Sequence, residues 1–541
     1  MEILITGLAE RVDGSLLDAN DPNRWRALPY RAEGFDGVML ACGEGDRPSS
    51  LTVRLGVTGR YDIHLGGFGF ISFWRLRARL SGDRCCKVFD PPPLACISEP
   101  VLHEFHFGQA ELTGQDLILE PPYLSSLHAY PAALAYIRLT PVSDPPPPSK
   151  PKVQYPLVFT NDGDGIFGEF PHRRQEDLLE SFERIGPDSC VRMLLWGNGD
   201  ADSCNYPTRV GQYAGGKGRY WSHFMQVKCN NLALWKRNGW DSLKVVRDYA
   251  KQRGWEFQVY IRMEAFRGLY PFDWIRSEFF ESHPECHCRD AQGRRVDRLS
   301  YAYPQVQDHM LALVSEIAGY EPDGVCFAFN RGVPVMLYEP IMVEGFKAAY
   351  GLDPRELDER DPRWADYQAR VFTPFMEKAK SVLKPGQRLS AIVLGNEADC
   401  RRWGLDVADW VARGVIDDLF PVGQKFTPQD VHIDGPECLD FDYFNALAGR
   451  TNVRLYPMLY PWALFQSDRA KWTAMLRSYL ADGADGYAVW DANEGDRFAG
   501  ANAVGLEPGT PTEAAKPEVR TVKLLELEGF RFDRYHYFEA I

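Results

Sequence analysis

A group of polar side chains stands at the end of an apolar run in the middle of this sequence. Residues 324–329 are apolar except for a leading glycine, and Asn330, Arg331, Tyr338 and Glu339 follow within ten positions. A buried strand that ends in this way presents an amide, a guanidinium, a phenol and a carboxylate, which can bind hydroxyl groups, hold a charge and move a proton. The stretch is therefore a candidate catalytic or binding loop.

Similar side chains follow the other apolar runs of the region. They are Asp162 and Asp164, Trp196 and Asp200, Arg262 and Glu264, Trp462, and Trp490 with Asp491. Carboxylates, amides and aromatic rings dominate these positions, and no G-x-S-x-G nucleophile motif occurs. Paired carboxylates are what glycoside hydrolysis needs, because one protonates the leaving oxygen while the other attacks or activates water. Aromatic rings and polar groups would then hold the sugar.

Strands that alternate with helices must position these residues. Eight strand candidates lie within 155–165, 189–200, 256–266, 323–332, 389–399, 417–424, 453–462 and 485–494. Amphipathic stretches such as 240–255 and 306–320 separate them. This pattern predicts a (β/α)8 TIM barrel over 156–500, whose active site would lie at the carboxyl ends of the strands. An open doubly wound sheet is the alternative, although no G-x-G-x-x-G loop supports it.

The remaining parts of the chain predict a second domain. Residues 1–143 contain short alternating strands separated by Gly and Pro turns, which favour an N-terminal β-sandwich domain. The proline-rich segment 144–155 is typical of a semi-rigid linker. Residues 501–541 are expected to form a C-terminal β segment that packs back on the sandwich.

Composition excludes several classes of partner. A net charge of −14 disfavours nucleic acids and anionic membranes, and no apolar run approaches the length of a transmembrane span. The N-terminal segment lacks the features of a secretory signal, so a cytoplasmic protein with reduced thiols is expected. Neither Cys286–Cys288 nor 160–165 has the spacing of a metal site, so no metal and no cofactor are expected. The oligomeric state stays open, a homo-oligomer included.

Residues 155–495 resemble the family-10-like glycosyl hydrolases of bacteria, which are (β/α)8 barrels distantly similar to the retaining glycosidase clan. The resemblance rests on DGVCFAFNRGVPVMLYEP, FKAAYGLDPRE, WGLDVADWVARGVIDDLFPVG and GADGYAVWDANE. It implies an acid/base glutamate after the fourth strand, which Glu339 matches, and a nucleophilic glutamate at the end of the seventh. The seventh candidate, 453–462, contains no carboxylate. The second catalytic residue is therefore left open between Asp491, Glu264 and Asp164.

These expectations define a hypothesis with named residues. A carbohydrate substrate would be cleaved by Glu339 with Asp491 or Glu264. It would be bound by Arg331, Asn330, Asp164, Tyr338, Trp196, Trp462 and Trp490. Two alternatives remain: a carbohydrate-binding barrel that has lost catalysis, and a metal-dependent hydrolase or lyase.

Overall fold

The chain forms two compact units, which are described separately. The structure is a computed structural model that describes residues 2–43, 48–68, 75–89, 100–121, 132–143, 156–183, 185, 190–215, 223–263, 276–426, 432–434, 436–459, 469–490, 520–528 and 530–531. The first unit comprises Met1–Pro151, Glu169–Arg184 and Ala515–Ile541, and the second comprises Lys152–Gly168 and Ile185–Ala514. Residues 169–184, expected in the barrel, therefore group with the first unit. The predicted linker, 144–155, lies outside the described residues.

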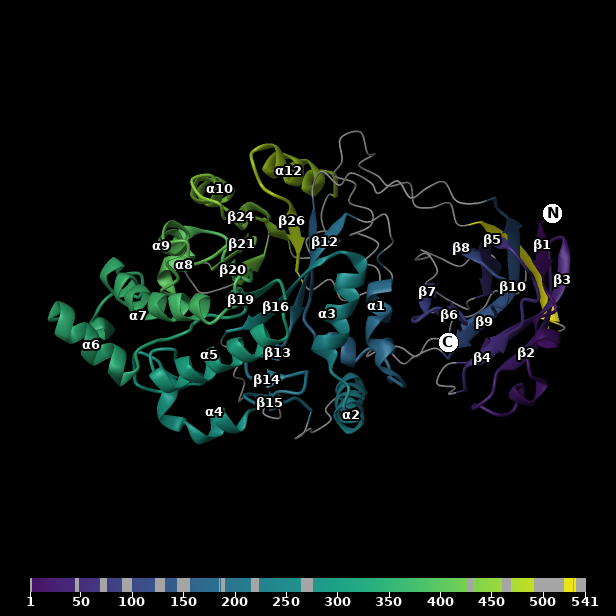
Figure 1. The fold of residues 1–541 in the computed structure, drawn as a ribbon, viewed down its shortest axis with the longest axis horizontal. Coiled ribbons are helices and arrows are strands. Elements are labelled where there is room, and N and C mark those ends of the chain that lie inside the picture. Colours follow the sequence, from purple (N-terminus) through teal and green to yellow (C-terminus); the bar gives the residue numbers. More distant parts are fainter. Residues whose placement is uncertain are drawn as a thin grey trace. The chain divides into compact units, whose positions relative to one another are not determined.

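The first unit is built from antiparallel strands (Figure 1). They are β1 (Ile3–Ile5), β2 (Arg26–Ala32), β3 (Phe35–Cys42), β4 (Leu51–Val53), β5 (Arg60–Phe68), β6 (Leu76–Leu80), β7 (Lys87–Phe89), β8 (Val101–Glu111), β9 (Leu117–Glu120), β10 (Ala132–Pro141), β27 (Thr521–Leu527) and β28 (Phe530–Arg531). The short helix α1 (Glu180–Glu183) also belongs to this unit. A sheet of eight strands and a sheet of four share one apolar core.

The larger sheet closes on itself. Strand β10 pairs with β3 and also with β5, and the path from β3 through β2, β27 and β8 leads back to β5. The predicted β-sandwich is therefore not established, because this sheet is a ring of strands rather than an open layer. Strand β27, from the last part of the chain, lies between β2 and β8.

The second unit is mixed α/β, with a central sheet in which every described strand pair is parallel. In sheet order the strands are β24 (Arg454–Leu455), β21 (Asp418–Pro421), β20 (Arg388–Val393), β19 (Gly324–Ala328), β16 (Glu256–Arg262), β12 (Val191–Gly197), β11 (Leu157–Asn161), β26 (Tyr487–Val489) and β25 (Met458–Leu459). Every strand candidate of the sequence coincides with at least one of these strands, and the candidate 453–462 contains two, β24 and β25. All described residues of β11 and β19 are buried, as expected for parallel strands covered on both faces.

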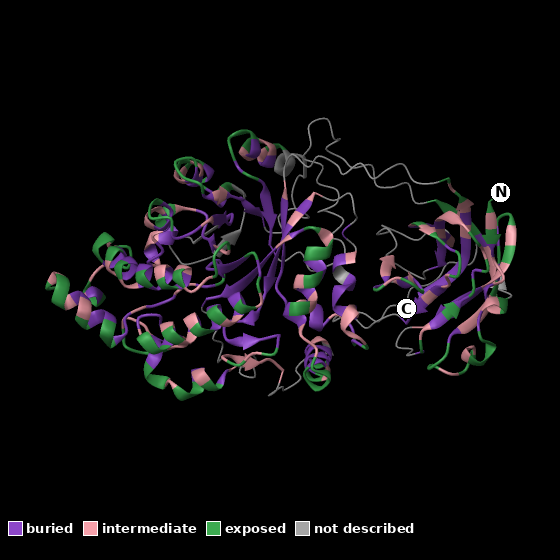
Figure 2. Ribbon diagram, viewed as in Figure 1, coloured by how far each residue is buried: buried purple, intermediate pink, exposed green. Residues whose placement is uncertain are grey.

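Helices surround this sheet, and their outward faces are exposed (Figures 1 and 2). They are α2 (His223–Asn238), α3 (Ser242–Arg253), α4 (Glu278–Ser282), α5 (Pro304–Gly319), α6 (Pro340–Tyr350), α7 (Pro362–Ser381), α8 (Glu397–Arg402), α9 (Val407–Ala412), α10 (Phe441–Ala448) and α12 (Arg469–Ala481). Shorter strands lie in the connections: β13 (Gly199–Asp200), β14 (Ser203–Cys204), β15 (Gln212–Tyr213), β17 (His287–Arg289), β18 (Arg295–Leu299), β22 (Gln424–Phe426) and β23 (His432–Asp434). In the part of the chain that is described, no helix has the length and apolar character needed to cross a bilayer.

Local signals in the sequence explain where the helices begin and end. Helix α3 begins after Asp241, whose side chain accepts a hydrogen bond from the Lys244 amide, and ends at Gly254 with φ of +70°. Helix α7 begins after Asp361 with a proline in its first turn. Acidic caps, first-turn prolines and terminal glycines are the usual helix boundaries.

The amino ends of the central strands are held by a buried ionic network. Asp418, which has no exposed surface, accepts hydrogen bonds from Arg454 Nε at 2.6 Å and from Arg388 Nη1 at 3.0 Å. Arg454 also donates to both carboxylate oxygens of Glu256, at 2.9 and 2.7 Å. Ser390 and Gln258 donate to the second oxygen of Asp418. This network joins strands β16, β20, β21 and β24 at one end of the sheet.

Candidate functional site

Carboxylates gather around an arginine at the opposite, carboxyl end of the strands. Arg262 is the last residue of β16, and its guanidinium lies 3.1 Å from Asp200 Oδ1 and 3.5 Å from Asp162 Oδ2. Asp162 follows β11, and Asp200 ends the short strand β13, which follows β12. Because β11, β12 and β16 are neighbours in a parallel sheet, their ends meet at one edge and bring these side chains together.

A third carboxylate, Asp164, joins the group through a buried lysine. The ammonium group of Lys228, on α2, forms an ion pair with Asp164, and the Lys228 side chain is only 3% exposed. We call Asp162, Asp164, Asp200, Lys228 and Arg262 the Arg262 cluster. It contains three carboxylates and two cations.

Burial raises the pKa of Asp164. The negative charges of Asp200 and Asp162 raise the pKa further, whereas Lys228 acts in the opposite direction. Charging a carboxyl that is largely removed from water and surrounded by like charges is costly, so its protonated form is favoured relative to a free aspartate. The pKa of Asp164 is thus raised by its surroundings although Lys228 pairs with it.

The loop that carries Asp162 and Asp164 is held rigidly. The Asp162 carboxylate accepts hydrogen bonds from the amides of Asp164 at 2.8 Å and Gly165 at 2.7 Å. Gly163 has φ of +64°, and a Cβ atom there would lie 2.0 Å from the Gly197 carbonyl oxygen. Only glycine fits, because the conformation is left-handed and the loop backbone passes directly against β12. The two carboxylates are thus preorganised by their own loop.

A cavity of about 670 Å³ lies beside the same β12 connection. Asp202 lines it and pairs with His309 Nε2 at 3.0 Å. The His309 ring stacks on Phe279, with ring centroids 3.8 Å apart. The cavity is thus lined by the Asp202–His309 pair and by the ring of Phe279, and Asp202 lies two residues after Asp200 in the sequence.

Glu339 does not have the geometry predicted for an acid/base residue. It has no exposed surface, and its Oε1 accepts hydrogen bonds from the amides of Leu337 at 3.0 Å and Arg289 at 3.2 Å. Its Oε2 lies 3.0 Å from the same Leu337 amide. Burial raises the pKa of Glu339, against these hydrogen bonds. We therefore correct its role: it ties the segment before α6 to β17.

Two predicted sugar platforms are also corrected. Trp196 and Trp490 have no exposed surface, and a sugar can stack only on an accessible ring face. Trp490 packs on Tyr260 in the core of the sheet, with ring centroids 5.4 Å apart. Tyr338 is almost fully buried and stacks on Trp364 at 5.1 Å. These rings stabilise the unit and do not offer a surface to ligand.

The other predicted residues divide into two groups. Arg331 is exposed, and its neighbour Asn330 is buried. Glu264, Asp491 and Trp462 lie outside the described residues, so their predicted roles stay predictions. Among the predicted site residues that are described, only Asp164 belongs to the Arg262 cluster.

Sequence reasoning had noticed most of the cluster without selecting it. Asp162, Asp200 and Arg262 were recognised as residues at strand ends. Lys228 was missed, because it lies inside an ordinary helical segment and nothing in its neighbours distinguishes it from a surface lysine. Its 3% exposed side chain is the signal that only the structure supplies.

Comparisons with known proteins give a broad similarity to glycoside hydrolases. No protein-family profile and no curated protein matches the sequence. Solved structures that match include a β-galactosidase from the psychrophilic Marinomonas ef1, with 12% identity and a TM-score of 0.40 over 62% of this chain and 54% of that one. The chain thus spans about half the length of that enzyme.

Two further matches extend over most of both chains. A β-(1,4)-mannanase from Podospora anserina shares 12% identity, with a TM-score of 0.30 over 93% of this chain and 95% of that one. An α-galactosidase from Thermus thermophilus shares 11%, with a TM-score of 0.32 over 88% and 94%. Because these TM-scores lie below 0.5, the matches carry no argument, and the proposals below rest on the residues of this chain.

Proposed function

We propose that the second unit is a (β/α)8 barrel that hydrolyses glycosidic bonds of an oligo- or polysaccharide. The observation that carries the proposal is the Arg262 cluster, in which three carboxylates meet at the carboxyl ends of adjacent parallel strands. This edge is where barrel enzymes hold their catalytic groups. Carboxylates of unlike proton affinity are what glycoside hydrolysis requires.

The pairing of the short strands supports a closed barrel. Strand β24 pairs with β21, whereas β25, which begins three residues after β24 ends, pairs with β26. An isolated bridge joins Val422 and Met458. If β24 and β25 are two halves of one seventh strand, the sheet returns to β11 through β26. Tyr260 lies on β16 and Trp490 follows β26, and β12 and β11 lie between these two strands in the sheet. Contact between the two rings therefore supports a sheet that curves into a barrel.

Asp164 is proposed as the general acid. Its raised pKa favours the protonated form that must transfer a proton to the leaving oxygen. Asp162 and Asp200 are engaged by Arg262, which would hold them in a fixed orientation. The second carboxylate is proposed from Glu264 or Asp491. Glu264 follows β16 and Asp491 follows β26, and these strands flank β12 and β11 in the sheet.

Each carboxylate can be tested by an isosteric amide. Asp164→Asn, Glu264→Gln and Asp491→Asn would be compared with wild type on a panel of aryl glycosides and oligosaccharides. Removing a general acid or base should lower kcat by about 10²–10⁴-fold. Asp442→Asn, an exposed aspartate on α10, is the matched control and should retain full activity. Unchanged kcat in Asp164→Asn would remove that residue from the mechanism.

A carbohydrate-binding barrel without catalysis is the second candidate. Its support is the seventh strand region, because Arg454–Leu455 and Met458–Leu459 offer no carboxylate. Binding of oligosaccharide without hydrolysis of any panel member would favour it. A cytoplasmic location is also kept as a proposal, and the eleven described cysteines, all free thiols, support it.

A further inference from the structure

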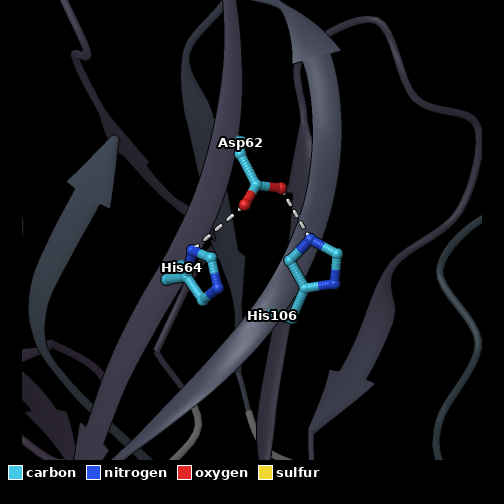
Figure 3. A group of neighbouring side chains, drawn as sticks. All are labelled: Asp62, His64 and His106. Atoms are coloured by element: carbon cyan, nitrogen blue, oxygen red, sulfur yellow. Dashed lines mark hydrogen bonds and ion pairs between the residues drawn. The ribbon is translucent and has the colours of Figure 1, made fainter. Parts of the chain in front are cut away.

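A group of potential metal ligands lies in the first unit. Asp62 and His64 are on β5, and His106 is on the neighbouring strand β8. Their potential ligand atoms all lie within 4.8 Å of one another. Figure 3 shows the Asp62 carboxylate facing both imidazole rings. None of these residues takes part in the function proposed for the second unit.

The strand geometry brings the three side chains onto one face. Asp62 and His64 are two residues apart in a strand, so both project to the same side. His106 is the direct partner of His64 across the strand pair, and the register shifts between Ile63 and His64. Gly108 has φ of +122° at this irregularity. A bulge of this kind redirects side chains and is frequent beside functional sites.

The distances between the donors suit a small divalent cation. Asp62 Oδ1 lies 2.7 Å from His106 Nε2, and Asp62 Oδ2 lies 3.8 Å from His64 Nδ1. Ligands about 2.0–2.1 Å from a tetrahedral zinc ion are separated by about 3.3 Å, which falls between the two observed distances. Small side-chain rotations are therefore enough to place an ion among the three groups.

One ligand atom makes no hydrogen bond among the described residues. His64 Nδ1 is buried, and its distance of 3.8 Å from Asp62 Oδ2 is too long for one. The nitrogen faces the Asp62 carboxylate, as Figure 3 shows, and therefore has the direction of a ligand.

The surroundings leave room for a cation and for one further ligand. Arg138, the nearby positive charge, is neutralised by Glu104, to which its Nε donates at 2.8 Å. The Tyr136 hydroxyl donates to the same carboxylate at 3.1 Å, so the two donors hold Glu104 in place. The His106 side chain is 60% exposed, which leaves the outer side open to water.

We propose that Asp62, His64 and His106 form a binding site for a divalent transition metal of the zinc class. Two imidazoles and one carboxylate are typical zinc ligands, and three protein ligands with an open fourth position leave room for water or an external ligand. The bound ion would link β5 to β8 through side chains, in addition to the backbone pairing of these strands.

The test uses the full-length chain after removal of metals with a chelator. Titration with Zn²⁺ should show one equivalent bound, and Co²⁺ should give visible d–d bands without the thiolate-to-metal charge transfer that cysteine ligands produce. His106→Ala and Asp62→Asn should each weaken binding by about tenfold or more, since even loss of a residue that only supports a ligand costs about 10–100-fold. His283→Ala, a histidine of the second unit, should bind like wild type.

Three outcomes would overturn the proposal. They are no zinc binding by the stripped protein, a thiolate band in the Co²⁺ spectrum, or binding that His106→Ala leaves unchanged. His106 is largely exposed, so its variant should fold, which circular dichroism would verify. If the three residues form only a hydrogen-bonded group, Zn²⁺ would leave the unfolding temperature unchanged. The proposed site instead predicts a rise that is absent from His106→Ala.

Discussion

The structure predicts that Glu339 supports the fold and not catalysis, and two substitutions separate these roles. In Glu339→Gln the amide oxygen can take the place of Oε1, which accepts from both Leu337 and Arg289. Only the second contact of the Leu337 amide, with Oε2, is lost. One neutral hydrogen bond contributes about 1 kcal/mol, so the free energy of unfolding should fall by about that amount.

Glu339→Ala removes every acceptor. The amides of Leu337 and Arg289 then lose their partner in a largely buried position. An unsatisfied buried donor costs about 1–3 kcal/mol, so the two together predict a loss of about 2–6 kcal/mol. Urea unfolding followed by fluorescence, compared among wild type and both variants, would measure the series. A free energy of unfolding that is far lower for Glu339→Ala than for Glu339→Gln would identify Glu339 as a structural hydrogen-bond acceptor.

Two further measurements separate a structural from a catalytic role of Glu339: the activity of the variants and the pH dependence of stability. If the role is structural, Glu339→Gln should keep wild-type kcat under conditions where it is folded. A general acid would instead lose several orders of magnitude with little change in stability, and that result would refute the reasoning. Because burial raises the pKa of Glu339, the folded state holds the proton more tightly than the unfolded state. The contribution of the Glu339 carboxyl to the free energy of unfolding should therefore decline as pH rises above about 4.5. The variant Glu339→Gln, which does not titrate, should lack this decline.

Further predictions concern the two ends of the central sheet and the thiols. Asp418→Asn should lower the free energy of unfolding by about 1.5–3 kcal/mol, measured by urea denaturation, because it weakens the hydrogen bonds of a buried carboxylate to Arg454 and Arg388. Gly163→Ala should reduce kcat on any substrate found, since a Cβ atom would meet the Gly197 carbonyl oxygen and displace the Asp164 loop. If Asp164 is the acid, kcat should fall as pH rises through its raised pKa, and Asp164→Asn should lose that limb of the profile. Cys190, the one described cysteine that is not buried, should react first with a maleimide in the native protein, as peptide mapping would check.

The strands of the second unit could be predicted from the sequence because parallel strands are buried on both faces. Each therefore appears as a short apolar run, as in 324–328 and 191–197, and a polar residue after the run marks its end. The ring of strands in the first unit could not be predicted. It depends on β10 pairing on both sides and on β27 pairing with β8, which lies more than 400 residues earlier in the chain, and neither leaves a local pattern.

The candidate site was only partly predictable for a related reason. A residue at a strand end can face substrate, core or a neighbouring loop, and its type alone does not decide among these. Glu339 became a buried acceptor because β17, fifty residues earlier, delivers the Arg289 amide to it. Trp490 turned inward onto Tyr260. Asp164 stays a predicted site residue, and its partner Lys228 comes from a helix whose orientation the sequence does not reveal.

The charge balance at the two ends of β16 supports the assignment of function to its carboxyl end. At the amino end, Glu256 and Asp418 meet Arg454 and Arg388, so two negative charges face two positive ones. Such a neutral, fully bonded network is what a purely structural cluster should be. At the carboxyl end, the described residues bring three carboxylates together with Lys228 and Arg262.

Three carboxylates that share one site cost folding free energy unless a proton or a positive charge compensates them. A proton on Asp164 is one compensation, and its raised pKa reflects it. The other is a positive charge that develops in the ligand itself, as in the oxocarbenium-like transition state of glycoside cleavage. Carboxylates held beside the reacting bond gain most when that charge appears, and they would then stabilise the transition state more than the substrate. If Lys228→Met raised kcat on a glycoside while lowering stability, the negative charge of the cluster would be the active feature; a fall in both would mean that the cluster only holds the strands together.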